Sequence, residues 1–319
     1  MSYEAPFPQQ LSRVEFVQLR FHLELNDYFD LPELAILQLR RELLQAFKDL
    51  QYQLNGTDVA GLKRIFFPEL PVDPSLLKQV QKPASALILS PDITQFGLME
   101  PKQHIILPVL AFGPAIHFVD TLSLLLKVLG KQGLYKGRGQ YTIDAIESQD
   151  ASGVRSMLWM NGEPVSPLTP PINDLSWWLE REKRFEDVLR IDVLSPLRML
   201  HKGRPLFKAD FVQIFPFILR RVTSFLGHYG QVDLTHEIPT YLNLLNQIKT
   251  LNNQLYWKDW RQLDRGQGRQ NLGGLVGFLD IGGAGLTSLL WILHIGRLLN
   301  LGKGAAYGAG QYSLAPVDS

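Results

Sequence analysis

The chain has 319 residues, 45% of them hydrophobic and 10% aromatic, with a net charge of +1 and no cysteine. This composition excludes a disordered chain, a disulfide and a thiolate metal site, and the length predicts two domains of ordinary size. The first ten residues lack the basic start and apolar core of a signal peptide, and the apolar runs are too interrupted to span a membrane. We therefore expect a cytoplasmic protein that makes no membrane contact.

Charge is distributed unevenly along the chain. Residues 181–319 carry 17 Lys and Arg against 11 Asp and Glu, whereas residues 1–180 carry 15 against 20. The second part therefore has a net charge of +6 and the first part of −5. A polyanion is expected to contact mainly the second part.

The first half of the chain predicts one α/β unit. Residues 14–25 alternate between apolar and polar side chains, which indicates a half-buried strand. A helix is expected from Pro32 to residue 50, and residues 51–84 are interpreted as irregular. The other expected elements are strands at 86–90 and 104–112, a helix at 115–130 and a strand at 140–146. This order predicts a ferredoxin-like domain over residues 1–147.

The second half repeats this outline more loosely. Residues 148–184 are expected to be a linker that carries a small hairpin at Asn161-Gly162. Residues 185–319 are expected to form the second domain. Its elements are a strand at 188–199, helices at 210–226 and 239–253, strand-like ends of the segment 255–281, a helix at 285–300 and a strand at 311–317. The sequence thus predicts an α+β protein with two tandem ferredoxin-like (RRM-like, βαββαβ) domains.

A glycine-rich pattern follows an apolar helix once in each half. At a constant offset of 171 residues, the second copy repeats the first, and the matched sets are Gly133, Gly137, Gly139, Gln140, Tyr141 and Gly304, Gly308, Gly310, Gln311, Tyr312. Two such copies indicate an internal duplication. The main-chain N–H groups of the loops suit a phosphate, and Lys136, Arg138 and Lys303 lie within them. The alternative is a plain helix-to-strand connection that needs left-handed residues.

Four stretches of the sequence resemble a known family. They are VLSPLRMLHKGRPL with FPFILRRVTSFLGHYG, LYWKDWRQLDRGQGRQNLGGLVGFL, ILHIGRLLNLGKGAAYGAGQYSL, and HIILPVLAFGPAIHF with KGRGQYTI. They are similar to the CRISPR repeat-RNA processing endoribonucleases of the repeat-associated mysterious protein (RAMP) superfamily. The likeness is to the branch whose C-terminal domain carries a glycine loop.

The resemblance implies an RNA-binding nuclease, a hydrolase of antiviral defence. Such a protein cleaves the repeat hairpin of precursor CRISPR RNA without a metal or cofactor and leaves a 2′,3′-cyclic phosphate. It keeps the guide RNA bound within an interference complex that contains other subunits. This chain departs from the family pattern at Asn300, where many members have a histidine.

Two other functions remain open at this point. Because the family's usual histidine is replaced, the chain is also compatible with a non-catalytic guide-RNA-binding subunit of the same kind of complex. Without the resemblance, the residues are compatible with a tandem α+β ligand-binding protein that has a phosphate loop.

Metal-free RNA cleavage needs a base for the 2′-hydroxyl, a cation for the phosphorane charge and an acid for the leaving oxygen. His22 is the first candidate catalytic residue, because it shares the polar face of the first strand with Arg20, and Tyr28 follows in the turn. The alternative for His22 is a solvated strand histidine. No histidine pair has metal-ligand spacing, so no metal is expected.

The expected RNA contacts are basic side chains and loop glycines, because arginine and lysine match phosphate oxygens. Arg261, Arg265 and Arg269 recur every four residues, and the resemblance adds an Arg-Arg helix. The alternative for these arginines is solvated surface. The full expected set is Arg20, Lys136, Arg138, Arg220, Arg221, Arg261, Arg265, Arg269, Gly302, Lys303, Gly304, Gly308 and Gly310.

Overall fold

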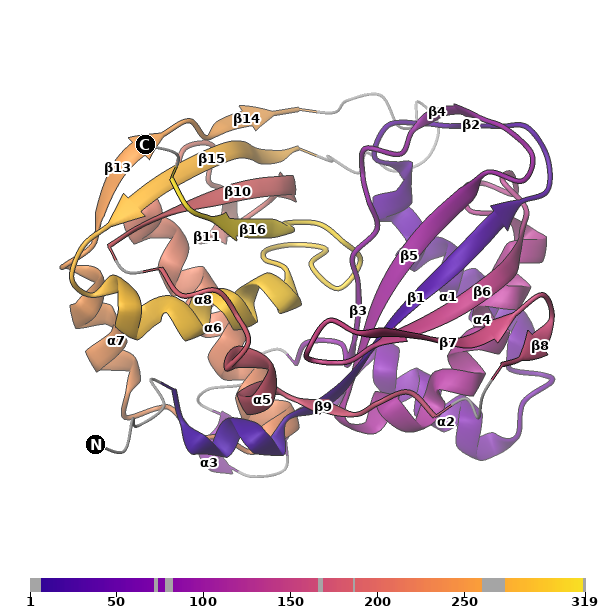
Figure 1. The fold of residues 1–319 in the computed structure, drawn as a ribbon, viewed down its shortest axis with the longest axis horizontal. Coiled ribbons are helices and arrows are strands. Elements are labelled where there is room, and N and C mark those ends of the chain that lie inside the picture. The colour runs from indigo at the N-terminus through magenta and orange to yellow at the C-terminus, as the bar shows by residue number, and fades with distance from the viewer. Residues whose placement is uncertain are drawn as a thin grey trace. The chain divides into compact units, whose positions relative to one another are not determined.

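The chain folds into two compact units, drawn in Figure 1 from the computed structural model. The structure describes residues 7–71, 74–77, 83–165, 169–185, 187–259 and 273–317. The N-terminal unit comprises Ser12–Leu70 and Pro83–Arg181, and the C-terminal unit comprises Met1–Leu11, Pro71–Lys82 and Glu182–Ser319.

The N-terminal unit is built on an antiparallel sheet. Its central strand β1 (Glu15–Leu25) lies between β5 (His104–Phe112) and β6 (Tyr141–Gln149), and β3 (Leu87–Leu89) pairs with the other side of β5. The two main helices, α1 (Leu39–Leu50) after β1 and α4 (Val119–Gln132) after β5, pack against each other. The strand order β3-β5-β1-β6 with these connections is a ferredoxin-like βαββαβ fold.

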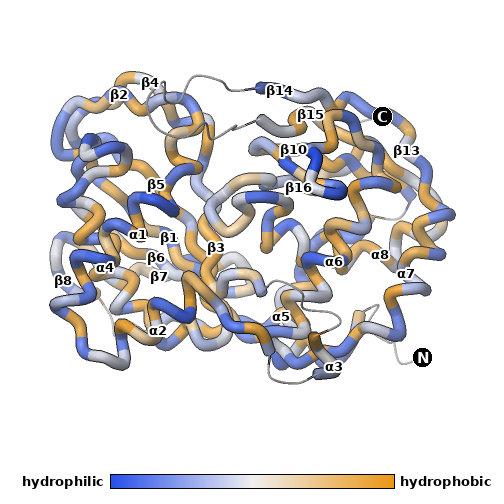
Figure 2. Tube along the Cα trace, turned by 180° about the vertical axis from the view of Figure 1, so that it is seen from behind, coloured by the Kyte–Doolittle hydropathy of each residue, from blue (hydrophilic) through white to orange (hydrophobic). Residues whose placement is uncertain are grey.

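Hydrophobic alternation along β1 fixes its register in this sheet. Val17, Leu19, Phe21 and Leu23 are at most 1% exposed, whereas the even-numbered residues between them are half-buried. Burying one such side chain contributes about 1.5–3 kcal/mol, and a slip by one residue would turn all of them to the other face. Figure 2 shows the corresponding apolar stretches in orange along the strands and helices of both units.

The C-terminal unit repeats the same topology. Its sheet has the order β13 (Lys249–Asn253), β15 (Gly274–Gly282), β10 (Val188–Leu197) and β16 (Tyr312–Ala315). The helices α6 (Phe211–Gly230) and α8 (Leu286–Leu299) cover one face of it (Figure 1). The prediction of two tandem ferredoxin-like domains is therefore confirmed.

Smaller elements complete the units. In the N-terminal unit these are β2 (Phe29–Leu31), η2 (Ala35–Gln38), α2 (Gly56–Phe66), β4 (Gly97–Met99), η3 (Gly113–Phe118), β7 (Arg155–Met160), β8 (Glu163–Pro164), β9 (Asn173–Asp174) and α5 (Leu175–Leu179). The C-terminal unit adds α3 (Pro74–Leu77), β11 (Leu200–His201), β12 (Arg204–Pro205), α7 (Ile238–Leu245) and β14 (Tyr256–Lys258), and η1 (Gln9–Arg13) spans the first boundary.

Hydrogen bonds around the two glycine loops also repeat. In each unit the tyrosine after the loop, Tyr141 or Tyr312, donates its hydroxyl to a carbonyl of the preceding helix, at 2.8 and 2.7 Å. The glutamine before each tyrosine donates to the loop glycine three residues earlier, at 2.8 and 3.0 Å. The matched sequences thus make matched contacts, as a duplication of one module requires.

The helix α2 occupies part of the segment 51–84 that was predicted to be irregular, so that prediction was wrong there. Asn55 caps α2, because its side chain accepts a hydrogen bond from the N–H of Asp58. Glycine weakens the helical signal of this sequence. Gly61 is nevertheless suited to its place, since a Cβ there would lie 2.1 Å from the ring of Phe118.

The segment 239–253, predicted as one helix, is a helix only as far as Leu245. Residues Lys249–Asn253 form β13 instead, because they pair with β15 at the edge of the second sheet. These residues are at least partly exposed and polar except for Leu251, so their own sequence gives little strand signal and the neighbouring strand determines their conformation.

The hairpin predicted within residues 148–184 is β7–β8. It turns at Asn161 and Gly162, which have φ angles of 52° and 90°. Because β7 pairs with β6, the hairpin extends the first sheet instead of lying in a separate linker.

The stretch Gly113–Gln132 is long and apolar enough to cross a membrane by length and composition, although the sequence analysis expected no such segment. Half of its most apolar window is buried inside the protein, and a core helix meets the same test.

Candidate functional site

Three polar side chains, His22, Arg20 and Glu147, meet on the face of β1 opposite its apolar core, and we name them the sheet cluster. His22 Nε2 lies 3.3 Å, and Arg20 Nε 3.4 Å, from Oε2 of Glu147 on β6. Burial lowers the pKa of Arg20, and repulsion by Arg155 lowers it further, while Glu147 acts in the opposite direction. The cluster thus places an imidazole beside a carboxylate that can orient it and a cation that can face a phosphate.

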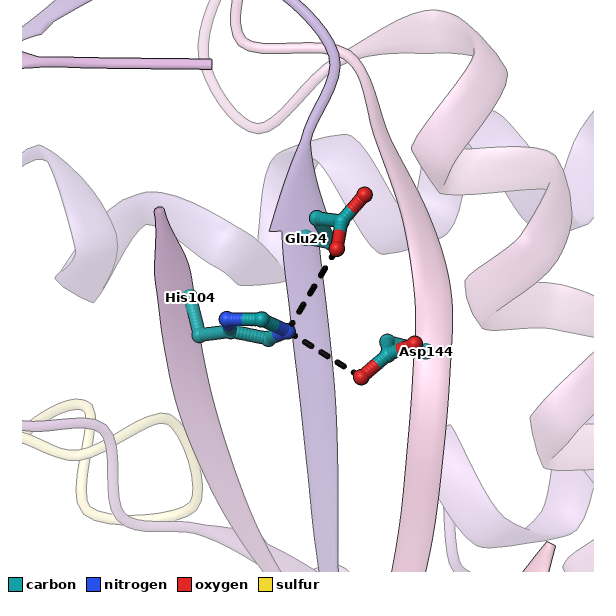
Figure 3. Close-up of side chains that lie close together, drawn as sticks. All are labelled: Glu24, His104 and Asp144. Atoms are coloured by element: carbon teal, nitrogen blue, oxygen red, sulfur yellow. Dashed lines mark hydrogen bonds and ion pairs between the residues drawn. The ribbon is translucent and has the colours of Figure 1, made fainter. Parts of the chain in front are cut away.

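A second histidine lies on the same sheet. His104 begins β5 opposite Glu24, and its Nε2 lies 3.1 Å from Oδ2 of Asp144 and 3.7 Å from Oε2 of Glu24 (Figure 3). Its ring centroid is 6.4 Å from that of His22. Within the described residues, Glu24, His104 and Asp144 are the group with the composition and spacing of a metal site. Sequence spacing did not indicate this group, because its members lie on three strands.

Tyr28 lies beyond the end of β1 and is 67% exposed. The turn that carries it contacts the first glycine loop, since Asn26 N donates to the carbonyl of Gln140 at 3.0 Å and a Cβ on Gly139 would lie 2.6 Å from the Phe29 ring. Among the described residues, no hydrogen bond or ion pair joins Tyr28 to His22. The structure therefore assigns the two predicted catalytic residues to different places.

Two cations lie near an aromatic ring at the first glycine loop. We name Arg41, Tyr135, Lys136 and the neighbouring Arg138 the loop cluster. Arg41 Cζ lies 5.9 Å and Lys136 Nζ 5.0 Å from the centroid of the Tyr135 ring. Glu42 holds the arrangement, because it accepts hydrogen bonds from the Arg41 guanidinium at 2.6 Å and from the Lys136 N–H at 3.5 Å. Lys136 and Arg138 are exposed, so both are available to a phosphate.

The second glycine loop uses much of its main chain within the protein. The N–H groups of Lys303, Tyr307 and Gly310 donate to carbonyls at 2.9, 2.9 and 3.1 Å, and those of residues 305, 308 and 309 also have carbonyl partners. The φ angles of Gly302, Gly304, Gly308 and Gly310 are 83°, 88°, 91° and 66°. These glycines therefore serve the left-handed backbone of the loop, and the exposed Lys303 side chain is its group best placed for an anion.

Arg221 and Asn300 hold the end of α8. The Arg221 guanidinium donates to the carbonyls of Leu299 at 2.8 Å and Asn300 at 3.1 Å, and burial lowers its pKa to about 10. Asn300, at φ 53° and 2% exposed, donates to the carbonyl of Ala305 at 3.0 Å. These contacts favour a structural role for Arg221 over the expected phosphate contact.

The other predicted arginines fall into two groups. Arg220 is exposed and lies 5.0 Å above the Phe217 ring, so it remains a candidate RNA contact. Arg261, Arg265 and Arg269 lie outside the described residues and stay predictions.

A basic hairpin lies in the C-terminal unit at residues 198–208, largely within a stretch that carries the family resemblance but contributes no expected RNA contact. It turns at Lys202 and Gly203, with φ angles of 48° and 79°, between β11 and β12. Its exposed basic side chains are His201, Lys202, Arg204 and Lys208. Phe207 is 57% exposed and its ring lies 4.6 Å from Trp257. Cations with an exposed aromatic ring suit single-stranded nucleic acid, and the turn residues between basic side chains were the available sequence signal.

Comparison with known protein families gives two matches. Residues 191–312 match the model described as CRISPR-associated endoribonuclease Cas6, and residues 14–171 match a model described as an N-terminal domain. A search of curated proteins finds no match.

Several solved structures are similar over both units. The complex titled "Cas6 (TTHB231) product complex" has 14% identity and a TM-score of 0.52 over 94% of this chain and 99% of that chain. Thermus thermophilus Cas6 (TTHB231) has 14% identity and a TM-score of 0.51 over 94% and 98%. A chain of a partial Cas6-RT-Cas1–Cas2 complex has 16% identity and a TM-score of 0.54 over 94% and 46%. At these identities the likeness concerns the fold alone.

Proposed function

We propose that this chain, whose residues 191–312 match the model of the CRISPR-associated endoribonuclease Cas6, cleaves the repeat hairpin of precursor CRISPR RNA without a metal and keeps the guide RNA bound. The observation that carries the proposal is the family match over residues 191–312, which contain the second glycine loop and the basic hairpin. The duplicated loops, with exposed Lys136, Arg138 and Lys303, add support because they offer cations in both units.

The sheet cluster offers the groups for the chemical step. In the proposed reaction the 2′-hydroxyl attacks the adjacent phosphorus and the 5′-oxygen leaves, which gives a 2′,3′-cyclic phosphate and a 5′-hydroxyl. His22 takes the proton of the 2′-hydroxyl, and a water molecule supplies the proton that the leaving 5′-oxygen needs. Glu147 lies against its Nε2, so Nδ1 is the nitrogen left to accept that proton. Arg20 beside them stabilises the phosphorane charge.

The loop cluster is the second location at which the same reaction could occur. There the Tyr28 phenol would exchange the proton, and Arg41 and Lys136 would face the phosphate. The hydrogen bond between Asn26 and Gln140 supports this grouping, because it holds the turn of Tyr28 against the loop.

A different function, a non-catalytic guide-RNA-binding subunit of an interference complex, has one observation in its favour. Asn300 stands where the family usually has a histidine, it cannot transfer a proton, and its amide is used inside the glycine loop. In either function the proposed partners are RNA and other subunits of the complex, in the cytoplasm.

The first prediction concerns cleavage in excess chelator. We expect the full-length protein to cut its repeat RNA to a 2′,3′-cyclic phosphate product, and His22→Ala to lower the single-turnover rate by about 10²–10⁴-fold, because a general base is lost. Binding of the RNA, measured by filter retention, should change little. His236→Ala, which removes an exposed histidine of the C-terminal unit, is the matched control and should cut normally.

Each other outcome has a definite meaning. Normal cutting by His22→Ala would show that the sheet cluster does not catalyse cleavage. Loss of cutting in Tyr28→Phe would then indicate that the reaction takes place at the loop cluster. Tight binding without any cutting by the unsubstituted protein would establish the guide-RNA-binding subunit. Neither binding nor cutting would reject both functions.

A further inference from the structure

We propose that Glu24, His104 and Asp144 form a binding site for one divalent transition-metal ion, with Zn²⁺ as its chemical type. The three side chains come from the neighbouring strands β1, β5 and β6 and converge on one face of the first sheet (Figure 3). The inference does not rest on the proposed RNA cleavage, which needs no metal.

The ligand atoms already have the spacing of a metal site. His104 Nε2 lies 3.1 Å from Asp144 Oδ2 and 3.7 Å from Glu24 Oε2, and all three atoms lie within 4.8 Å of one another. Four ligands around a tetrahedral ion at ~2.1 Å lie about 3.4 Å apart. The two distances from His104 fall on either side of this value, so small side-chain rotations would admit an ion.

The backbone of the sheet fixes the three positions. Glu24 and His104 are direct partners in the antiparallel pairing of β1 with β5. The pairing of β1 with β6 contains a bulge in which Ala145 faces His22 and Ile143 faces Leu23, so Asp144 is the extra residue. The carbonyl of Asp144 accepts a hydrogen bond at 3.0 Å from the N–H of Asn161, which holds the bulge on its other side. Ligands on paired strands are held more accurately than ligands on loops.

The charge of the group favours a cation. Its two carboxylates face one imidazole, and within the described residues no lysine or arginine forms an ion pair with Glu24 or Asp144. The two carboxylates lie side by side on adjacent strands, and like charges in that arrangement are unfavourable. A divalent ion would neutralise both.

The ligand types select the class of ion. One imidazole nitrogen and two carboxylate oxygens suit Zn²⁺ and chemically similar ions, whereas Ca²⁺ takes six to eight oxygens and Mg²⁺ keeps several waters. His104 is 39% exposed and each carboxylate side chain 34%, so water can complete the coordination.

The test is a titration of the full-length protein, freed of metal by chelator and dialysis, with ZnCl₂ in a calorimeter. We expect one saturable site per chain and a rise in melting temperature on adding zinc. Co²⁺ bound in place of Zn²⁺ should give the visible absorption of a tetrahedral complex. His104→Ala and Asp144→Asn should each weaken binding at least ~10-fold, because even indirect partners of a metal are worth that much.

Two controls make the result specific. His236→Ala removes an exposed histidine outside the group and should bind zinc as the unsubstituted protein does. Glu24→Gln keeps the size of the side chain, so weaker binding by this variant with an unchanged unfolding curve excludes misfolding as the cause. Absence of a one-to-one site, or equal affinity in His104→Ala, would overturn the proposal and leave the ion pairs of His104 as the whole explanation of the group.

Discussion

His294 on α8 is a buried histidine that its surroundings keep neutral. Its side chain is 4% exposed, and its Nε2 donates to the carbonyl of Lys183 at 2.9 Å. Burial lowers its pKa to about 4, and repulsion by Arg297 adds to the effect, while the bond to Lys183 acts against it. The burial and the hydrogen bond to Lys183 give His294 a structural role.

This histidine predicts a pH dependence of stability. The unfolded chain, with a histidine pKa of about 6.5, binds a proton between pH ~6.5 and ~4 that the native state excludes. The contribution of His294 to the free energy of unfolding is therefore fully present above pH ~6.5. It falls by up to about 3 kcal/mol as the pH approaches 4. We expect the unsubstituted protein to lose more free energy of unfolding than His294→Gln between pH 7 and pH 5, measured by denaturant titration.

Glu182 has the opposite effect on the pH dependence of stability. Its Oε2 lies 3.4 Å from His294 Nδ1. Burial raises its pKa, so protonation of this carboxyl favours the native state as the pH falls. The loss of free energy of unfolding in the unsubstituted protein should therefore be smaller than the loss caused by His294 alone. His236→Gln, at an exposed site, is the control and should keep the slope of the unsubstituted protein. Identical slopes for His294→Gln and the unsubstituted protein would contradict the assignment.

The two glycine loops require glycine for different reasons, which are the backbone conformation and the space left for a side chain. Gly310, at φ 66°, has the carbonyl oxygen of Leu301 1.8 Å from the place of a Cβ. Gly137 of the first loop, at φ 75°, has nothing within 4 Å of that place. Both positions need a left-handed backbone, but only the first is also closed to a side chain.

This contrast predicts the effect of alanine at the two positions. Gly137→Ala should lower the free energy of unfolding by about 1–2 kcal/mol, because an L-residue is strained in the left-handed region. Gly310→Ala should lower it by clearly more, because a methyl group would also displace the Leu301 backbone. Denaturant unfolding of both variants measures the difference, and equal losses would show that the loop around Gly310 opens freely.

For the whole molecule, the distribution of charge predicts how RNA binding responds to salt. Residues 181–319 carry 17 basic against 11 acidic side chains, and the basic hairpin lies among them. If the hairpin contacts phosphates, the logarithm of the association constant for RNA should fall linearly with the logarithm of the salt concentration. Each phosphate neutralised on a single strand contributes about 0.7 to this slope.

The double variant Lys202→Ala/Arg204→Ala should make this salt slope shallower by roughly 1.4, because two phosphate contacts are lost. The matched control is Lys63→Ala/Arg64→Ala, which removes the same charge from the exposed side of α2. Binding of the repeat RNA at several salt concentrations gives both slopes. An unchanged salt slope in Lys202→Ala/Arg204→Ala would show that the basic hairpin does not contact the RNA.

Elements with a local periodicity could be predicted from the sequence alone. The strand predicted at 104–112 is β5 with the same bounds, and the alternation over 14–25 is β1. The duplication could also be predicted, because one module repeated at a constant offset keeps its pattern of glycine, glutamine and tyrosine. The edge strand β13 was missed, because its conformation comes from pairing with β15 and not from its own residues.

The side chains that meet could be identified only once the strands were paired in three dimensions. His22 was chosen from its place on a polar strand face, but its partner Glu147 and the group around His104 depend on strand register and on one bulge. Tyr28, six positions from His22, lies instead with a glycine loop far along the chain. Sequence patterns record which face a residue occupies, whereas the distance between two residues of different strands is set by the pairing of the whole sheet.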